Sequence, residues 1–193
     1  MDHELELVDS VLAGDQEAFG ELVELYQRPV YNLAYRMLGE AGEAEDAAQE
    51  AFLRAYQHLD RYDRTRPLKT WLLSITSNFC IDRLRKRRLT WLSLEEPLPP
   101  HPSLTSVEAE PEDAALSGER HAAIQTMLTD LAPEYRAAVV LRYWYDMSYT
   151  EIAEMLDTTE SAIKSRLFRA RQSLAEKMEG DKVNRLIMAV EGI

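Results

Sequence analysis

Lysine and arginine side chains are concentrated in two short stretches of an otherwise acidic chain. The 193 residues carry 22 Lys and Arg against 34 Asp and Glu, a formal net charge of -12. Residues 61–92 nevertheless hold nine basic and two acidic side chains, and residues 160–177 hold five basic and two acidic ones. Cations grouped in this way can neutralise phosphates, while the acidic remainder of the chain repels them. The charge pattern predicts a protein that contacts DNA at two places and binds it weakly without help.

The second basic stretch follows a sequence typical of a helix-turn-helix. Ser148 and Glu151 form a capping box, in which the serine caps a helix and the glutamate three residues later reaches back. A turn over residues 157–159 follows, and Thr159 is the expected N-cap of a helix that begins at Glu160. A short helix, a tight turn and a basic helix in this order predict a helix-turn-helix.

The helix that begins at Glu160 divides into an inward stripe and an outward polar face. Its apolar residues at helical spacing are Ile163, Leu167, Ala170 and Leu174. The outward face and its flanks carry Ser161, Lys164, Ser165, Arg166, Arg169, Arg171 and Gln172. A recognition helix needs this division, because central side chains reach base edges in the major groove while flanking cations meet phosphates. We therefore expect this face to read duplex DNA, the alternative being an ordinary solvated helix surface.

The first basic stretch combines cations with an aromatic ring and amide side chains. A predicted helix over residues 67–88 carries Lys69, Trp71 and Asn78 and ends in the basic run 83–88. Aromatic rings beside cations suit unpaired bases, which stack on the ring while the nucleic-acid backbone lies in a positive groove. The sequence favours contact with unpaired bases here, although a tryptophan taken alone is more often a core residue.

The elements that position these residues are predicted to be helices almost throughout. The chain contains only 7 Gly and 8 Pro, and strong helix formers are abundant. Gly14 and Gly39 are expected helix ends, and Asp15 is an expected N-cap. In the helix over residues 67–88 the apolar residues change phase after Phe79, so that helix is either packed on two sides or kinked. We expect an all-α fold of two small helical domains, the second a helix-turn-helix domain.

A flexible linker is predicted between the two domains. Residues 95–112 contain five prolines, several acidic residues and no Lys or Arg. About 20 extended residues reach roughly 65 Å, more than one ~34 Å turn of DNA, so the two domains can reach separate sites on one duplex. The predicted boundaries are 1–92 for the first domain, 93–113 for the linker, 114–178 for the second domain and 179–193 for a C-terminal tail.

Composition argues against several other classes of protein. No run of about 18 apolar residues occurs, and residues 1–6 are acidic where a secretory signal would be basic, so we expect no membrane insertion and a cytoplasmic location. Cys80 is the single cysteine, which excludes an internal disulfide and predicts a buried thiol. An enzyme could use Glu45, Asp46 and Glu50 as metal ligands, but no histidine or partner motif accompanies them, so we expect no enzyme, metal or other cofactor.

Three stretches of the chain together resemble the bacterial extracytoplasmic-function sigma factors. They are EAEDAAQEAFLRAYQHLDRYD, PLKTWLLSITSNFCIDRLRKRR and LAPEYRAAVVLRYWYDMSYTEIAEMLDTTESAIKSRLFRARQSL, with the acidic linker before the third. Members of that family are initiation subunits of RNA polymerase that keep only the second and fourth conserved sigma domains. The resemblance covers about residues 8–177. It implies a protein that binds core RNA polymerase and directs promoter-specific initiation by recognising, and helping to open, minus-ten and minus-thirty-five elements.

The resemblance also implies a role for each group of matched residues. The residues implied in core polymerase binding are Asp46, Gln49, Glu50, Phe52 and Leu53. Those implied in contact with the minus-ten element are Lys69, Trp71, Asn78, Arg83, Arg85, Lys86 and Arg87. Those implied in reading the minus-thirty-five element are Ser161, Lys164, Ser165, Arg166, Arg169 and Arg171. Two positions depart from the family pattern: Asp157 stands where the turn usually has glycine, and Ala162 replaces a frequent threonine. Aspartate accepts a left-handed backbone more readily than most residues.

An anti-sigma factor is a further implied partner, because activity in this family is commonly restrained by one. The alternative function is a stand-alone helix-turn-helix transcriptional regulator that uses residues 118–177. Such a regulator would need a dimer and a two-fold operator, and the sequence shows no evident dimerisation seam. The two hypotheses differ in that a sigma factor depends on polymerase, whereas a regulator binds its duplex tightly when isolated.

Overall fold

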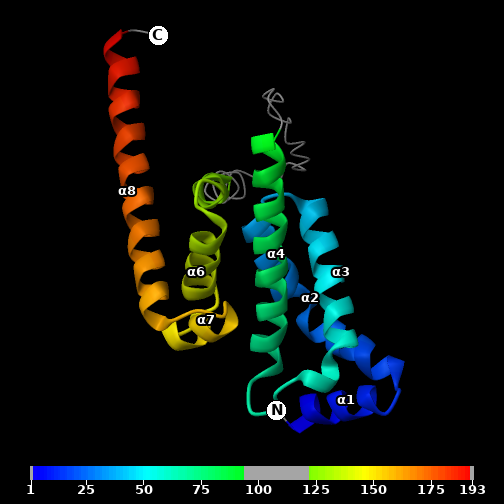
Figure 1. Ribbon diagram of the computed structural model, residues 1–193. Coiled ribbons are helices and arrows are strands. Elements are labelled where there is room, and N and C mark those ends of the chain that lie inside the picture. The colour runs from blue at the N-terminus through cyan, green and yellow to red at the C-terminus, as the bar shows by residue number, and fades with distance from the viewer. Residues whose placement is uncertain (1, 94–121, 192–193) are drawn as a thin grey trace. The chain divides into compact units, whose positions relative to one another are not determined.

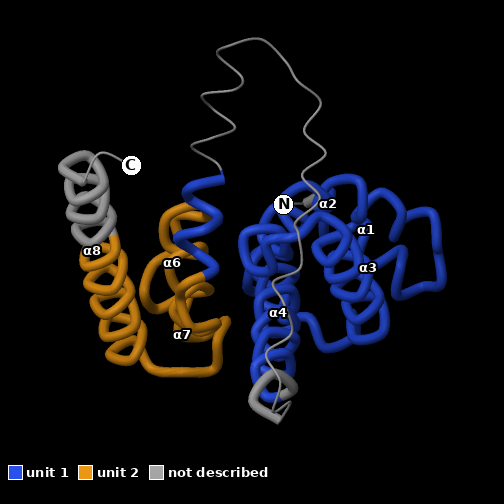
Figure 2. Tube along the Cα trace, turned by 90° about the horizontal axis from the view of Figure 1, so that it is seen from above, with its two compact units in different colours: residues 1–129 blue, residues 130–193 orange. Residues whose placement is uncertain are grey.

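The computed structural model describes residues 2–93 and 122–191, with side chains placed for residues 3–89 and 122–177. It divides into two compact units, residues 1–129 and 130–193 (Figure 2). Within the described ranges every regular element is a helix, so the predicted all-α fold is confirmed. Apart from Ser93, the predicted linker lies outside the described residues, and the predicted domain boundaries stay predictions.

Unit 1 is a helical bundle. Its elements are α1 (Asp2–Leu12), α2 (Gln16–Leu38), α3 (Ala41–Gln57), the 3-10 helix η1 (Leu59–Arg61) and α4 (Leu68–Ser93) (Figure 1). Helix α2 contacts α1, α3 and α4, and α3 also packs on α4. Apolar side chains fill the interior because each helix carries them at helical spacing. Fully buried examples are Val8, Val30, Leu33, Met37, Leu68 and Leu73.

The predicted ends of the first helices are confirmed. Gly14 has a left-handed backbone with φ +102°, and the Asp15 carboxylate then caps α2, accepting a hydrogen bond from the Glu17 N–H at 2.9 Å. At the other end Gly39 has φ +85°, and its N–H donates to the Tyr35 carbonyl at 2.8 Å. Glycine takes these left-handed positions because it has no Cβ to clash.

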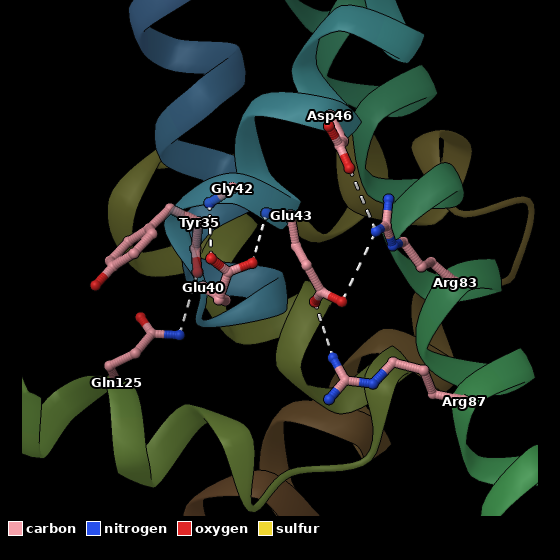
Figure 3. A network of polar contacts seen from close by, with 8 residues as sticks. All are labelled: Tyr35, Glu40, Gly42, Glu43, Asp46, Arg83, Arg87 and Gln125. Atoms are coloured by element: carbon pink, nitrogen blue, oxygen red, sulfur yellow. Dashed lines mark hydrogen bonds and ion pairs between the residues drawn. The ribbon is translucent and has the colours of Figure 1, made fainter. Parts of the chain in front are cut away.

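A helical segment over residues 122–129 also belongs to unit 1. The Gln125 amide donates to the Tyr35 carbonyl at 3.2 Å (Figure 3). It also donates to the Arg36 carbonyl at 3.2 Å. These carbonyls lie in the last turn of α2, and the Gln125 amide adds to the hydrogen bond that the Gly39 N–H already donates to the Tyr35 carbonyl. A Cβ on Gly39 would lie 3.3 Å from the Gln125 amide nitrogen, so this close approach is a second reason for glycine there.

Helix α4 is continuous and is packed on two sides, by α2 and by α3. The phase change predicted within it therefore reflects two-sided packing and not a kink: Leu72 and Ile81 are both buried. The buried hydroxyls of Thr76 and Ser77 donate to the carbonyls four residues earlier, each at 2.8 Å, so neither is left without an acceptor. Cys80 is a buried thiol, as predicted.

Unit 2 is built from α6 (Pro133–Trp144), α7 (Tyr149–Met155) and α8 (Glu160–Glu191) (Figure 1). The three helices share one core, whose most enclosed side chains are Ala137, Val140, Leu141, Ile152, Ile163, Leu167 and Ala170. The inward stripe predicted for the last helix is confirmed at Ile163, Leu167 and Ala170. Helices α7 and α8 with the turn between them form the predicted helix-turn-helix.

The caps of this motif follow the sequence prediction. Ser148 Oγ accepts from the Glu151 N–H at 3.2 Å, and the Glu151 carboxylate accepts from the Ser148 N–H at 2.8 Å. This is the complete capping box. In the turn Asp157 has φ +46°, the left-handed conformation expected where the family pattern has glycine. Thr159 Oγ1 then caps α8 by accepting from the Ala162 N–H at 3.1 Å.

The capping box gives the stability of unit 2 a pH dependence. Hydrogen bonds from the Ser148 hydroxyl and then its backbone N–H hold the pKa of Glu151 below its usual value of 4.5. A depressed folded-state pKa contributes stability above the unfolded-state pKa, and this contribution is lost as pH falls through the folded-state pKa. We expect Glu151→Gln to lower the melting temperature of unit 2 at neutral pH, with the gap to wild type closing below about pH 4.5. Thermal unfolding followed by circular dichroism across pH tests this, and a gap that stays constant would argue against it.

Across the parts of the chain that the structure describes, no helix is both long and apolar enough to cross a membrane.

Candidate functional site

The predicted minus-ten residues lie on two different faces of α4. Trp71, Asn78 and Arg85 follow one another at intervals of seven residues, close to two helical turns, so they form one stripe. Trp71 is half-buried, whereas Asn78 and Arg85 are exposed. Arg83 and Arg87 instead turn towards α3 (Figure 3).

Packing holds Trp71 at the first turn of α4. The centroid of its ring lies 5.3 Å from that of Tyr62, with the two planes 41° apart, and both rings pack against the hydrophobic core. In the preceding loop the Asp63 carboxylate accepts from the hydroxyl of Thr65 at 2.7 Å and from its N–H at 3.0 Å, which lowers the pKa of Asp63. Trp71 therefore has part of the core role that the sequence left open, because one side of its ring packs against the core. The exposed part of the ring remains accessible to a base.

Three of the predicted minus-ten cations have exposed side chains on α4: Lys69, Lys86 and Arg85, the last of which also belongs to the Trp71 stripe. Arg85 Nη1 lies 3.7 Å from a carboxylate oxygen of Asp82 one turn earlier, and both side chains are largely in water. Exposed ion pairs of this kind contribute about 0–1 kcal/mol, so such a contact yields readily to a phosphate.

Arg83 and Arg87 form an ion-pair network with α3 (Figure 3). Arg87 Nη1 donates to Glu43 Oε2 at 2.8 Å. Arg83 Nη2 lies 3.7 Å from Glu43 Oε1 and 3.6 Å from Asp46 Oδ2. The family resemblance implies that Asp46 contacts polymerase and Arg83 contacts DNA, as separate sites, and the structure brings the two side chains into contact.

Helix α3 carries the predicted polymerase-binding residues on its accessible side, with one exception. Asp46, Gln49 and Leu53 are exposed and Glu50 is half-buried; the leucine is 54% exposed. Phe52 is only 8% exposed and belongs to the hydrophobic core of unit 1. The predicted polymerase contact of Phe52 stays a prediction, and its buried ring offers little surface to a partner.

Two of the three carboxylates that could have served as metal ligands, Asp46 and Glu50, contact arginines. Besides the contact of Asp46 with Arg83, Glu50 Oε1 lies 2.7 Å from Arg54 Nε one turn later on α3. The Arg54 guanidinium also lies 4.8 Å from the centre of the Phe79 ring. In the described part of the chain no group of three or more His, Cys, Asp or Glu side chains could hold a metal ion.

The predicted minus-thirty-five residues lie along the accessible face of α8. The exposed ones are Ser161, Lys164, Ser165, Arg169 and Arg171, while Arg166 is half-buried. Lys164 Nζ lies 2.6 Å from Glu160 Oε1, a hydrogen bond that raises the pKa of the lysine. Arg171 Nε donates to the Leu167 carbonyl at 3.3 Å, and Arg169 Nη1 donates to the Tyr135 hydroxyl at 3.4 Å.

Phe168 is a candidate that sequence reasoning missed. Its side chain is 62% exposed, although it is a large apolar residue. It follows Ser161 by seven residues and Ser165 by three, so it lies on the same face as both. That spacing was visible in the sequence, but an apolar residue in a helix is normally assigned to the core.

Comparison with known proteins agrees with this architecture of a first helical unit followed by a helix-turn-helix unit. Residues 22–90 match the family Sigma-70 region 2, and residues 121–174 match Sigma-70, region 4. The chain is 39% identical to the ECF RNA polymerase sigma factor SigW of Bacillus subtilis over 176 residues, covering 89% of this chain and 94% of that protein. It is 32% identical to the ECF RNA polymerase sigma-E factor of Escherichia coli K12 over 186 residues, covering 90% and 93%. The chain belongs to the ECF sigma factor family.

Solved structures show the same fold. The chain superimposes on CnrH, solved in complex with the cytosolic domain of CnrY, with a TM-score of 0.64 and 24% identity over 93% of this chain and 99% of that one. It also superimposes on the sigma factor RpoE, solved in complex with the anti-sigma factor NepR from Bartonella quintana, with a TM-score of 0.59 and 25% identity over 83% and 96%. Sigma factors are transcription initiation factors and form a non-catalytic family.

Proposed function

We propose that this sigma factor binds core RNA polymerase in the cytoplasm and directs it to promoters by reading two elements with two units. Unit 1 binds polymerase and the opened minus-ten element, and unit 2 reads the minus-thirty-five element. The observation that carries this proposal is that two separate helix faces have residues suited to DNA contact. They are the aromatic and basic side of α4 and the basic side of the α8 recognition helix. An acidic chain with two small basic faces binds DNA weakly until polymerase presents both faces together, which raises their effective concentration.

The accessible side of α3 binds polymerase. Leu53 supplies exposed apolar area, and Asp46, Gln49 and Glu50 supply polar groups around it. An exposed large apolar side chain with a polar rim is typical of a protein-protein contact.

Contact with the minus-ten element falls to α4. Trp71 stacks on an unpaired base, and Asn78, on the same stripe, donates or accepts a hydrogen bond at a base edge. The cations that hold the DNA backbone are Lys69, Arg83, Arg85, Lys86 and Arg87. Removing a base from the duplex stack costs a few kcal/mol, and stacking on an aromatic ring returns about 1–3 kcal/mol per base.

Reading of the minus-thirty-five element falls to α8. Ser161, Ser165 and Arg169 face the base edges, and Lys164, Arg166 and Arg171 meet the phosphates. Phe168, exposed among them, suits apolar contact with a thymine methyl group in the major groove.

An anti-sigma factor is the further partner that we propose. Its support is the likeness to RpoE, which was solved in complex with the anti-sigma factor NepR. Such a partner would cover the polymerase-binding and DNA-binding faces and so prevent initiation.

Arg169→Ala and Arg171→Ala are expected to weaken promoter binding in different ways. Loss of Arg169 should relax discrimination at the base pair it reads, at a cost of about 1–3 kcal/mol. Loss of Arg171, whose Nε is held by the Leu167 carbonyl on the flank of the helix, should weaken all sequences alike and reduce the salt slope by about 1. Holoenzyme binding to promoter variants at several salt concentrations measures both effects. Equal loss on every sequence for both variants would refute this division of roles.

Reconstitution with core polymerase tests the proposed function itself. Purified chain added to core polymerase from the same organism should give transcripts that depend on a selected promoter, and that vanish when the minus-ten element is scrambled. Core polymerase alone is the control. Tight binding of the isolated chain to a palindromic duplex, without polymerase-dependent transcripts, would instead favour a stand-alone regulator.

A further inference from the structure

Two of the arginines assigned to promoter DNA already have carboxylate partners within unit 1. The Glu43 carboxylate accepts a hydrogen bond from Arg87 at 2.8 Å and lies 3.7 Å from Arg83, and the Asp46 carboxylate lies 3.6 Å from Arg83 (Figure 3). Two carboxylates and two guanidinium groups carry no net charge together. Arg83 and Arg87 are therefore neutralised locally before DNA arrives.

Glu43 is the most enclosed member of this cluster. Its side chain is 24% exposed, against 31% for Arg83, 48% for Arg87 and 69% for Asp46. Electrostatic interactions strengthen as water is excluded, so the contacts of Glu43 are less screened than those of Asp46. Glu43 is also the member that contacts both arginines, which lie one helical turn apart and would otherwise repel each other.

The start of α3 fixes where Glu43 lies. The carboxylate of Glu40, the N-cap residue, accepts hydrogen bonds from the Glu43 N–H at 2.7 Å and from the Gly42 N–H at 2.9 Å. A carboxylate in the first turn is further stabilised by the helix dipole. Glu43 is thus held beside the arginines of α4 by the fold.

We propose that Glu43 determines specificity in promoter recognition: its carboxylate competes with DNA phosphates for Arg83 and Arg87 and so suppresses sequence-independent binding. The inference rests on the proposed function, because it takes these two arginines to be backbone contacts. Phosphate contacts strengthen binding to every sequence alike and carry no sequence information. Occupying them with a carboxylate weakens binding to ordinary DNA, while the Trp71 stripe that meets unpaired bases lies on another face and is unaffected.

Polymerase is expected to reverse this competition at a promoter. Asp46, the exposed carboxylate of the cluster, is also a proposed polymerase contact, so docking would draw it away from Arg83. Polymerase also holds the opened DNA beside α4, and the high local phosphate concentration then displaces weak, partly exposed ion pairs. The arginines therefore contact DNA mainly in the initiation complex, which widens the ratio of promoter to non-promoter binding.

The test compares Glu43→Gln with Glu45→Gln in the full-length chain. Both changes remove one negative charge from the first turns of α3, but Glu45 is exposed and is not part of the network in Figure 3. Binding to a fluorescent non-promoter duplex is measured by anisotropy at several salt concentrations. We expect Glu43→Gln to bind about fivefold more tightly than wild type, with a salt slope steeper by about 0.9 for each phosphate contact regained. Glu45→Gln should stay within about twofold of wild type.

The outcomes separate the proposal from its rivals. An equal gain for both variants would mean a general charge effect, and a loss for Glu43→Gln would mean that Glu43 orients the arginines for DNA; either result overturns the proposal. In an Arg83→Ala/Arg87→Ala background the Glu43→Gln gain should disappear, and its persistence would also overturn the proposal. Glu43→Asp keeps the charge on a shorter side chain and should give a smaller gain in affinity for the non-promoter duplex. This second variant keeps the test informative if Glu43→Gln does not fold.

A holoenzyme assay distinguishes failure of this inference from failure of the proposed function. With core polymerase, Glu43→Gln should still initiate at the promoter, but its ratio of promoter to non-promoter binding should fall by about fivefold. If wild type gives no promoter-dependent transcript, the proposed function fails. If wild type is active and Glu43→Gln matches it in both ratio and duplex binding, only the role of Glu43 fails.

Discussion

Trp71→Ala is expected to reduce open-complex formation by about ten- to a hundredfold while leaving affinity for core polymerase unchanged. Stacking of an unpaired base on an aromatic ring contributes about 1–3 kcal/mol, and each 1.4 kcal/mol corresponds to about tenfold. The ring is pre-positioned by its contact with Tyr62 at 5.3 Å, so little ordering is needed when the base arrives. Promoter opening is followed with a fluorescent base in the minus-ten element, and polymerase affinity is measured by competition.

Trp71→Phe is the matched control, because it keeps an aromatic ring at the same place. It should retain most of the opening activity, whereas Trp71→Ala should not. Since Trp71 also packs against the core, the melting temperature of unit 1 is measured for both variants. If alanine lowers the melting temperature but leaves opening by the folded protein intact, Trp71 has a packing role only.

Ile163→Ala is expected to destabilise unit 2 by about 2–5 kcal/mol, the usual cost of emptying a fully buried aliphatic site. Ile163 has no exposed surface and lies on the inward stripe of α8. The free energy of unfolding of native proteins is about 0.05–0.15 kcal/mol per residue, so this loss is a large fraction of the total for a three-helix unit. Minus-thirty-five discrimination should collapse, while polymerase binding through α3 persists. Thermal unfolding and competition for core polymerase measure the two effects.

The milder Ile163→Val should cost about 0.5–1.5 kcal/mol and leave promoter discrimination largely intact. It removes one methyl group and keeps the same shape at the branch point. Loss of polymerase affinity in Ile163→Ala equal to the loss of minus-thirty-five binding would be evidence against docking through α3.

Local backbone rules account for what the sequence predicted well. The pair Gly14 and Asp15, the cap at Gly39 and the box formed by Ser148 and Glu151 each depend on residues a few positions apart. The left-handed backbone of Asp157 depends on that residue alone. Such features are readable without knowledge of the tertiary fold, and they mark both ends of α2 and the first residues of α7 and α8.

Features that depend on which helices pack together could not be read in the same way. Phe52 and Leu53 are adjacent and both apolar, and only the packing of α3 decides that the first is buried and the second exposed. The charge pattern along residues 61–92 predicted a basic region but could not indicate which of its cations pair with carboxylates. The carboxylates that engage Arg83 and Arg87 come from another helix, about 40 residues earlier in the chain, so no local pattern reveals them.

The roles of individual site residues came from the family resemblance and remain predictions. What the structure adds is their accessibility. It leaves Trp71 half-buried and Asn78 exposed on one stripe, and it adds Phe168 to the face of the recognition helix. These placements decide which substitutions separate folding from function.

Because Cys80 is buried, the chemical reactivity of its thiol reports how often unit 1 opens locally. The chain has one cysteine, and its side chain has no exposed surface where α4 packs between its neighbours. A maleimide or disulfide reagent can modify the sulfur only after α4 separates from the bundle, so the labelling rate measures that opening directly. The native protein needs no engineered cysteine for this measurement. Repeating the labelling with polymerase or another partner bound would show how much each partner lowers the labelling rate and so stabilises the closed bundle.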